Sequence, residues 1–157
     1  MPDMLVPLLK LPEMASLHEK YEKQGIRVRR ALAPDLEKII SWVRERFGSG
    51  WASECTVAMC NVPATCFIAT KGKEIVGFAC CEATNKNFFG PTGVAEEYRS
   101  LGIGKALLLI SLLAMRDMGY AYAIIGGAGP VAFYEKAFDA RVIENSAPSI
   151  YSNMIES

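Results

Sequence analysis

A glycine-containing loop is the segment of this sequence best suited to binding a phosphate group. Residues 98–105 read Tyr-Arg-Ser-Leu-Gly-Ile-Gly-Lys and lead into an apolar segment, residues 103–118, that is predicted to be a helix. Gly102 and Gly104 allow the backbone to approach a ligand closely. The first N–H groups of the helix and the positive end of its dipole point at the same place. This combination predicts a site for a pyrophosphate.

Two common phosphate-binding loops do not fit the residues of this segment. A P-loop that ends at Lys105 requires glycine in place of Arg99 and serine or threonine in place of Ala106, so the hydroxyl that binds magnesium is missing. A dinucleotide-binding motif that begins at Gly102 requires glycine or alanine in place of Leu107. The loop therefore belongs to neither class.

A third pattern fits the loop and the segments around it. From Arg99 to Gly104 the chain reads R-x-x-G-x-G. Together with three segments in the same order and spacing, this loop resembles the GNAT superfamily of N-acetyltransferases; the segments are residues 94–109, 120–125 and 133–136. The resemblance spans residues 26–156 and implies the GNAT acyl-CoA N-acyltransferase fold. That fold is a mixed α/β, α+β-like structure, in which helices flank a mostly antiparallel central sheet with splayed middle strands.

The resemblance implies acetyl-CoA as co-substrate. The loop amides would hold the CoA pyrophosphate, and the preceding strand would pair with the pantetheine arm like an added strand. The residues so implicated are Gly93, Val94 and Ala95 on the strand, and Arg99, Ser100, Leu101, Gly102, Ile103, Gly104 and Lys105 in the loop. One position departs from the family, because Gly127 stands where an asparagine frequently contacts the CoA arm. This change would either weaken cofactor binding or widen the channel for a longer acyl chain.

Transfer of an acetyl group to an amine requires an acid, oxyanion donors and a base. Tyr134 stands where the resembled family often carries the acid that protonates the leaving thiolate, and this tyrosine would also contact CoA. By the same resemblance, the backbone N–H of Val94 would stabilise the oxyanion. Residues 87–94 contain no carboxylate, although relatives often place a glutamate there. Glu82, Glu54 or a chain of water molecules remain as candidates for the base.

The acceptor site is expected in the helices between the first two strands of the fold. Phe47 and Trp51 supply apolar walls, and Arg46 could orient an acidic group of the substrate. A primary amine of a small metabolite, amino acid-like or amino-sugar, is the expected acceptor. A protein N-terminus or lysine is the alternative acceptor, and a non-catalytic acyl-CoA-binding sensor is the alternative of another class.

The elements that would position these residues follow from apolar periodicity and turn residues. Helices are predicted at residues 13–24, 34–47, 51–61, 103–118 and 130–138. Strands are predicted at residues 26–30, 65–70, 74–81, 88–94 and 120–125, with two closing strands within 141–156. Gly90, Pro91 and Gly93 predict a broken ladder in the strand at 88–94. We predict an N-terminal helical extension at residues 1–25 and a single N-acetyltransferase domain at residues 26–157.

Composition limits the classes of partner. Lysine plus arginine and aspartate plus glutamate both number 17, which disfavours nucleic acid as the main partner. No signal peptide or membrane span is visible, so we expect a cytoplasmic protein without a membrane partner. Five cysteines without a C-x-x-C pair and a lone histidine, His18, favour reduced thiols and no metal. The resemblance to the family is the only ground for expecting a homodimer.

Overall fold

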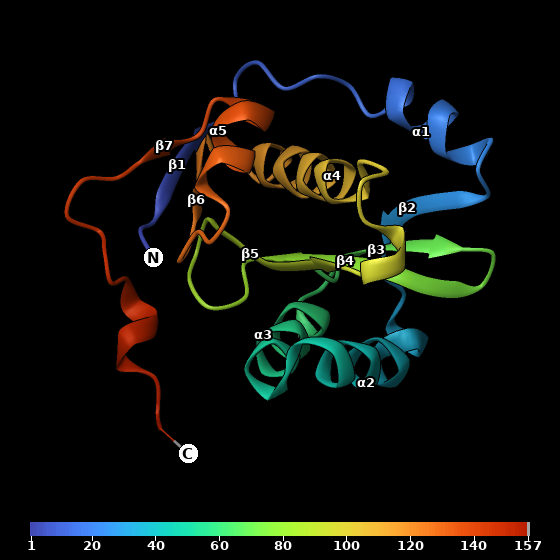
Figure 1. Cartoon of the computed structure of the whole chain (residues 1–157), viewed down its shortest axis with the longest axis horizontal. Helices are drawn as coiled ribbons and strands as arrows, with labels where there is room; N and C mark the ends of the chain where they lie inside the picture. The colour runs from blue at the N-terminus through green and yellow to red at the C-terminus, as the bar shows by residue number, and fades with distance from the viewer. Residues whose placement is uncertain (157) are drawn as a thin grey trace.

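One mixed sheet of seven strands organises the chain in the computed structural model, which describes residues 1–156 apart from the side chain of Ser16 (Figure 1). The strands are β1 (Met4–Pro7), β2 (Ile26–Arg30), β3 (Cys66–Lys71), β4 (Glu74–Cys81), β5 (Phe88–Val94), β6 (Tyr122–Ile125) and β7 (Arg141–Val142). The helices are α1 (Ala15–Glu22), α2 (Leu36–Phe47), α3 (Ser49–Cys60), α4 (Ile103–Asp117) and α5 (Val131–Phe138), with short 3-10 helices at Ala33–Asp35, Glu96–Tyr98 and Ile150–Asn153. The strand order is β2-β3-β4-β5-β6-β1-β7, and the neighbouring strands are antiparallel except β5 and β6. The expected mixed α/β fold is confirmed.

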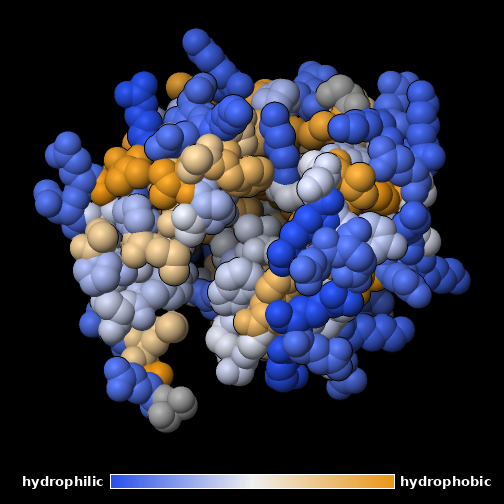
Figure 2. Space-filling view, in the orientation of Figure 1, coloured by the Kyte–Doolittle hydropathy of each residue, from blue (hydrophilic) through white to orange (hydrophobic). Residues whose placement is uncertain are grey.

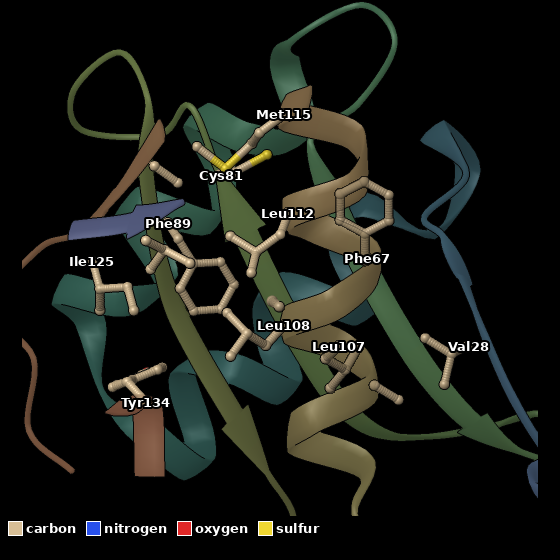
Figure 3. Packing of buried hydrophobic residues seen from close by; sticks show 14 of the residues in the cluster. Val28, Phe67, Cys81, Phe89, Leu107, Leu108, Leu112, Met115, Ile125 and Tyr134 are labelled. Carbon is tan, nitrogen blue, oxygen red and sulfur yellow. The ribbon is translucent and has the colours of Figure 1, made fainter. Parts of the chain in front are cut away.

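Two hydrophobic layers enclose the central strands. On one face α4 packs its buried side chains, Leu112 among them, against the sheet around Phe67 and Phe89 (Figure 3). On the other face α2 and α3 cover Ile68 and Phe78. Successive residues of β3 and β4 alternate between these two layers, as strand geometry requires. Both faces are therefore buried, which explains the nearly continuous apolar sequence of these strands.

The central strands part in the middle of the sheet. β5 pairs with β6 only at Phe88 and Phe89, whereas its pairing with β4 continues to Val94. The ladder between β4 and β5 also shifts register between Ala79 and Cys81. The predicted irregular strand is confirmed. Beyond Phe89 the edge of β5 that faces away from β4 has no strand partner, so its backbone groups are free to pair with a ligand.

Most of the predicted elements are confirmed within a few residues. The hairpin of β3 and β4, the long apolar helix α4 and the shorter α5 lie where the sequence places them. The two consecutive helices between β2 and β3 are also present as α2 and α3. α2, α4 and α5 have strong local patterns with glycine or proline near their ends, and the hairpin has two apolar runs joined at Gly72, whereas α3 has little apolar periodicity.

The first residues of the chain form a strand that the sequence analysis did not predict. β1 lies between β6 and β7 and pairs antiparallel with both. Met4 and Val6 are buried, whereas Leu5 and Pro7 point outward. This alternation is hidden in the sequence because all four residues are apolar. Residues 1–25 therefore contribute a strand to the sheet as well as the helix α1.

The prediction of two closing strands within residues 141–156 is wrong. Only Arg141–Val142 forms a strand, and it pairs with β1. The place beside β6 that a further strand would need is already occupied by β1. The remaining C-terminal segment, residues 143–156, leaves the sheet and ends with the 3-10 helix at Ile150–Asn153 (Figure 1).

Candidate active site

The loop before α4 forms a helix N-terminus with free backbone donors. Gly102 adopts a left-handed conformation (φ +80°) and caps the helix without any side-chain hydrogen bond. The first helical bond runs from the Ala106 N–H to the Gly102 carbonyl, so the N–H groups of residues 103–105 have no acceptor within the helix. The Tyr21 hydroxyl donates to the Leu101 carbonyl (3.2 Å) and supports the loop from below. Three free donors and the helix dipole together form an anion site.

Two cationic side chains border this anion site. Arg99 is exposed, and its Nε donates to the carbonyl of Val94 (3.2 Å). Lys105 is exposed as well, and its Nζ lies 5.6 Å from the centre of the Phe138 ring. Neither side chain is held by an ion pair among residues 1–156, so both can turn toward a bound phosphate. Of the other loop residues, Ser100 and Leu101 face solvent, whereas Ile103 is buried and anchors the helix.

The free edge of β5 offers a second set of backbone donors. The Ala95 N–H donates to the Val76 carbonyl (2.8 Å), so the N–H of Gly93 also faces β4, because alternate residues of a strand face the same edge. The N–H groups of Val94 and Thr92 therefore face the opposite edge, where β6 has already ended. Among the three strand residues that the resemblance implicates, Val94 is the one whose N–H faces this edge. Thr92 was not among the predicted site residues.

Tyr134 lies in α5 above the point where β5 and β6 part. Its side chain is only 6% exposed, and its ring makes an edge contact with Phe89 (centroid distance 6.4 Å) (Figure 3). Burial raises the pKa of the Tyr134 hydroxyl to about 12. Within residues 1–156 this hydroxyl makes no hydrogen bond and its oxygen is not fully buried, so it can donate to a ligand. Phe89 belongs to the last pair between β5 and β6, which brings Tyr134 to the beginning of the free edge.

Glu82, one of the two candidate bases, is engaged in local contacts. One carboxylate oxygen accepts a hydrogen bond from the Asn87 N–H (2.6 Å) and the other from the Tyr120 hydroxyl (3.1 Å). Glu82 also lines a pocket of about 610 Å³ beside Asp117, near the C-terminal end of α4. This is the end of the helix away from the anion site. These contacts indicate that Glu82 holds the loop between β4 and β5 in place.

Glu54, the other candidate base, lies on α3 and faces the loop between β4 and β5. The Thr84 hydroxyl donates to its carboxylate. The Tyr151 side chain, from the C-terminal segment, lies near the Thr84 and Glu54 side chains. Burial raises the pKa of Tyr151 to about 12, and the neighbouring Glu54 carboxylate adds to the increase. The sequence analysis missed Thr84 and Tyr151 as site residues.

The two predicted aromatic walls of the acceptor site pack together on β5. Phe47 stacks with Trp51 (5.2 Å) and contacts Phe78 (5.7 Å). A Cβ atom on Gly93 would lie 2.5 Å from the Phe47 ring, so this ring lies directly on the β5 backbone. Trp51 is 38% exposed at the edge of the cluster. Phe47 is therefore a packing residue beneath β5, and Trp51 is the one of the two that a ligand can contact.

Arg46 lies beside this cluster. Its guanidinium forms an exposed ion pair with Glu97 (3.5 Å) and lies 5.2 Å from the centre of the Trp42 ring. Glu97 belongs to the segment that joins β5 to the anion site. Arg46 thus links α2 to this segment, and a substrate would have to compete with Glu97 for its charge.

The two ends of the chain meet at the turn after β6. The Asp3 carboxylate accepts a hydrogen bond from the Gly127 N–H (2.8 Å), and the Asp3 N–H donates to the Ser146 hydroxyl (2.8 Å). The Tyr151 ring covers this turn, since a Cβ atom on either Gly126 or Gly127 would lie 3.2 Å from the ring. The paired glycines were the only sequence signal for this contact, because they permit a close approach.

Three buried thiols form the one metal-ligand cluster found in residues 1–156. The Sγ atoms of Cys55, Cys66 and Cys80 lie within 4.8 Å of one another, and no histidine or carboxylate joins them. All three side chains are inaccessible to solvent, and burial raises the pKa of Cys80 well above its ordinary value. Structural zinc sites usually have four ligands. The expectation that the protein holds no metal stays a prediction.

The middle strands of this sheet part beside a helix N-terminus that is capped by glycine. This is the arrangement of the acyl-CoA N-acyltransferase folds. Residues 63–137 match the family model for an acetyltransferase (GNAT) domain. Over these residues the match confirms the resemblance seen in the sequence. No curated protein sequence matches the chain. In residues 1–156 no helix is both long and apolar enough to cross a membrane.

Two solved structures illustrate the shared fold. The first is a GCN5-related glucosamine N-acetyltransferase region of a fungal multi-domain β-N-acetylglucosaminidase; it is 14% identical, with a TM-score of 0.72 over 90% of this chain and 19% of that chain. The second is a GCN5-related N-acetyltransferase from Sphaerobacter thermophilus, 21% identical, with a TM-score of 0.69 over 90% of this chain and 48% of that chain. This chain therefore spans between a fifth and a half of these longer proteins. At these identities the likeness shows the fold alone.

Proposed function

We propose that this protein transfers an acetyl group from acetyl-CoA to a primary amine of a small metabolite, amino acid-like or amino-sugar. One observation carries the proposal: the free N–H groups at the start of α4 and the free edge of β5 adjoin each other, so one ligand can use both. A molecule that joins a pyrophosphate to an extended amide-containing arm fits this combination, and CoA is such a molecule. The match to the GNAT domain model supports the same ligand.

The reaction follows from this placement. The amides of residues 103–105 bind the pyrophosphate, and the pantetheine arm runs along β5. The Val94 N–H lies beside this pyrophosphate site, because a Cβ atom on Gly104 would lie 3.8 Å from Cγ2 of Val94, so it pairs with the near end of the arm. The thioester then lies farther along β5, toward Phe89 and Tyr134. The neutral amine attacks the carbonyl carbon, the oxyanion collapses, and the C–S bond breaks to release CoA. Tyr134 donates its proton to the departing sulfur.

The raised pKa of Tyr134 is compatible with this role. An ordinary thiol has a pKa of about 8.5, so a tyrosine of higher pKa is formally the weaker acid. The thiolate, however, would form beside the same apolar surface that surrounds Tyr134. Burial there raises the pKa of the thiol as well, because it disfavours every anion. The gap in acidity within the site is thus smaller than the raised pKa of Tyr134 by itself would give.

The acceptor is proposed to enter from the side of α3, where Trp51 is exposed beside β5. The fungal neighbour is described as a glucosamine N-acetyltransferase region, which supports including amino sugars among the candidate acceptors. The balanced charge of the chain suits a small-molecule acceptor better than a polyanion.

Substitution of Tyr134 by phenylalanine tests the proposal. We expect thiol release from acetyl-CoA with at least one amine of a panel of amino sugars, amino acids and short peptides. In Tyr134→Phe, kcat should fall at least about tenfold, because the general acid is lost. The KM for acetyl-CoA should change little, since the ring remains.

Tyr122→Phe is the matched control, because Tyr122 is 49% exposed on β6 and its hydroxyl is in no proposed step. Its kcat should equal that of the wild type. Equal rates in Tyr134→Phe would remove Tyr134 from the mechanism. Binding of acetyl-CoA without turnover of any amine would favour the non-catalytic sensor.

The pH dependence gives a second prediction. Tyr134 has a pKa of about 12 in the folded protein, against 10.0 for an ordinary tyrosine. It keeps its proton over the assay range, so kcat should not fall between about pH 7 and about pH 10. The same shift stabilises the folded protein below about pH 10, and this contribution is lost as the pH rises through about 12. A decline of kcat near about pH 9 that Tyr134→Phe abolishes would contradict the prediction.

A further inference from the structure

Four segments that are distant in the sequence meet where β5 and β6 part. They are α3 with Glu54, the loop between β4 and β5 with Thr84, the turn after β6 with Gly126, and the C-terminal segment with Tyr151. Gly126 directly follows Ile125, which forms the last pair with Phe89 of β5. The group therefore adjoins the beginning of the free β5 edge. Figure 2 shows a hollow on this face between the C-terminal segment and the body of the domain.

The polar atoms of this group converge on one carboxylate. The Thr84 hydroxyl donates to Oε1 of Glu54, and the Tyr151 side chain lies near both of these side chains. The Tyr151 ring is seated on the Gly126–Gly127 turn, and its backbone N–H donates to the Ser149 hydroxyl (3.3 Å). The Thr84 hydroxyl thus orients the carboxylate of Glu54, and Tyr151 lies beside it.

The charge of Glu54 is not neutralised by the protein. The ion pairs of the described residues are Arg29 with Asp35 and Arg46 with Glu97, and neither includes Glu54. A primary amine is protonated at neutral pH, since its pKa is near that of lysine, about 10.4. It must bind as a cation and lose a proton before it can attack. An oriented, unpaired carboxylate at the same end of the free β5 edge as Tyr134 serves both needs.

We infer that Glu54 binds the ammonium group of the acceptor and accepts its proton, and that Thr84 and Tyr151 position its carboxylate. The inference rests on the proposed function and names the base of the same site. In this step one N–H bond of the ammonium breaks and an O–H bond forms on Glu54. The neutral amine keeps the electron pair that attacks the thioester, and Glu54 later returns the proton to water. Tyr151 also makes the C-terminal segment a wall of the acceptor site.

The test separates binding of the amine from binding of acetyl-CoA. In Glu54→Gln, which keeps the shape of the side chain, we expect kcat/KM for the amine to fall at least about a hundredfold. The affinity for acetyl-CoA, measured by calorimetry, should stay within about twofold of the wild type. In Tyr151→Phe, kcat/KM for the amine should fall about tenfold with the same affinity for acetyl-CoA.

Conservative variants distinguish positioning from a merely structural role. Thr84→Ser keeps the hydroxyl and should retain most of the activity, whereas Thr84→Val keeps the shape and should lose about as much as Tyr151→Phe. Glu45→Gln is the control for Glu54→Gln, because Glu45 is an exposed glutamate of α2. Thermal unfolding of each variant should match that of the wild type, since Glu54 and Thr84 are not part of the core.

Three outcomes would overturn the inference. If the wild type acetylates an amine and Glu54→Gln does so with unchanged kcat/KM, the base is elsewhere, and the proposed function survives. If Glu54→Gln lowers kcat/KM for the amine and the affinity for acetyl-CoA together, Glu54 acts on the co-substrate. If the wild type binds acetyl-CoA but acetylates no amine, the proposed function fails, and the assignment of Glu54 fails with it.

Discussion

Substitution of Gly104 by glutamate is expected to lower the affinity for acetyl-CoA at least about a hundredfold, because it places a carboxylate at the proposed pyrophosphate site and removes charge-assisted hydrogen bonds. Gly104 lies in the first turn of α4, beside the free N–H groups of residues 103–105. The new carboxylate would occupy these donors and repel the phosphates. An acidic residue in the first turn also complements the helix dipole, so the folded state should not be weakened.

Gly104→Ala is the matched control. A Cβ atom on Gly104 would lie 3.8 Å from Cγ2 of Val94, which is an ordinary contact. The alanine variant should therefore bind acetyl-CoA within about threefold of the wild type. Gly102 is less suitable, since its φ is +80° and an added Cβ atom would lie 2.8 Å from the Tyr21 hydroxyl. Calorimetric titration decides the matter: equal affinity in Gly104→Glu would place the pyrophosphate elsewhere.

Substitution of Val6 by aspartate is expected to lower the free energy of unfolding by about 4 kcal/mol or more, because it buries a carboxylate without a partner. Val6 is 1% exposed and lies opposite Ala123 in the ladder between β1 and β6. The ladder itself would survive the change, since the substitution keeps the backbone groups. The decrease in the free energy of unfolding therefore measures how much β1 contributes to the core.

Leu5→Asp is the control on the same strand, because Leu5 is 37% exposed and points away from the core. Its free energy of unfolding, from urea titration followed by circular dichroism, should lie within about 1 kcal/mol of the wild type. Equally small effects in both variants would mean that residues 4–7 are a loose extension. A chain that begins at residue 26, the predicted domain boundary, would lack β1 and should not fold.

The anion site could be predicted from the sequence because it is local. Arg99, Gly102 and Gly104 lie within one turn of the start of α4, and the glycine conformation, the helix dipole and the free amides all arise from this short segment. The irregular β5 strand was also predictable, since Gly90 and Pro91 disrupt a ladder wherever they occur in a strand. The same holds for the hairpin of β3 and β4, where residues that are close in sequence pair with each other.

The partners of Glu54 were not predictable in this way. Thr84 lies 30 residues away from Glu54 in the chain, and no periodic pattern connects them. Tyr151 was placed in a predicted strand, although it reaches the site only because the C-terminal segment leaves the sheet. That departure depends in turn on β1, which occupies the neighbouring position in the sheet.

The sequence by itself thus determined the helices, the hairpin and the phosphate-binding loop. Each of these depends on residues that are close to one another in the sequence. The tertiary structure alone decided which strand lies beside β6, where the C-terminal segment runs and which carboxylate adjoins the free edge of β5. The hydrogen bond from the Asp3 N–H to Ser146 spans 143 residues of sequence. Contacts of this kind leave no local periodicity, because they form only when the packed core brings the two ends of the chain together.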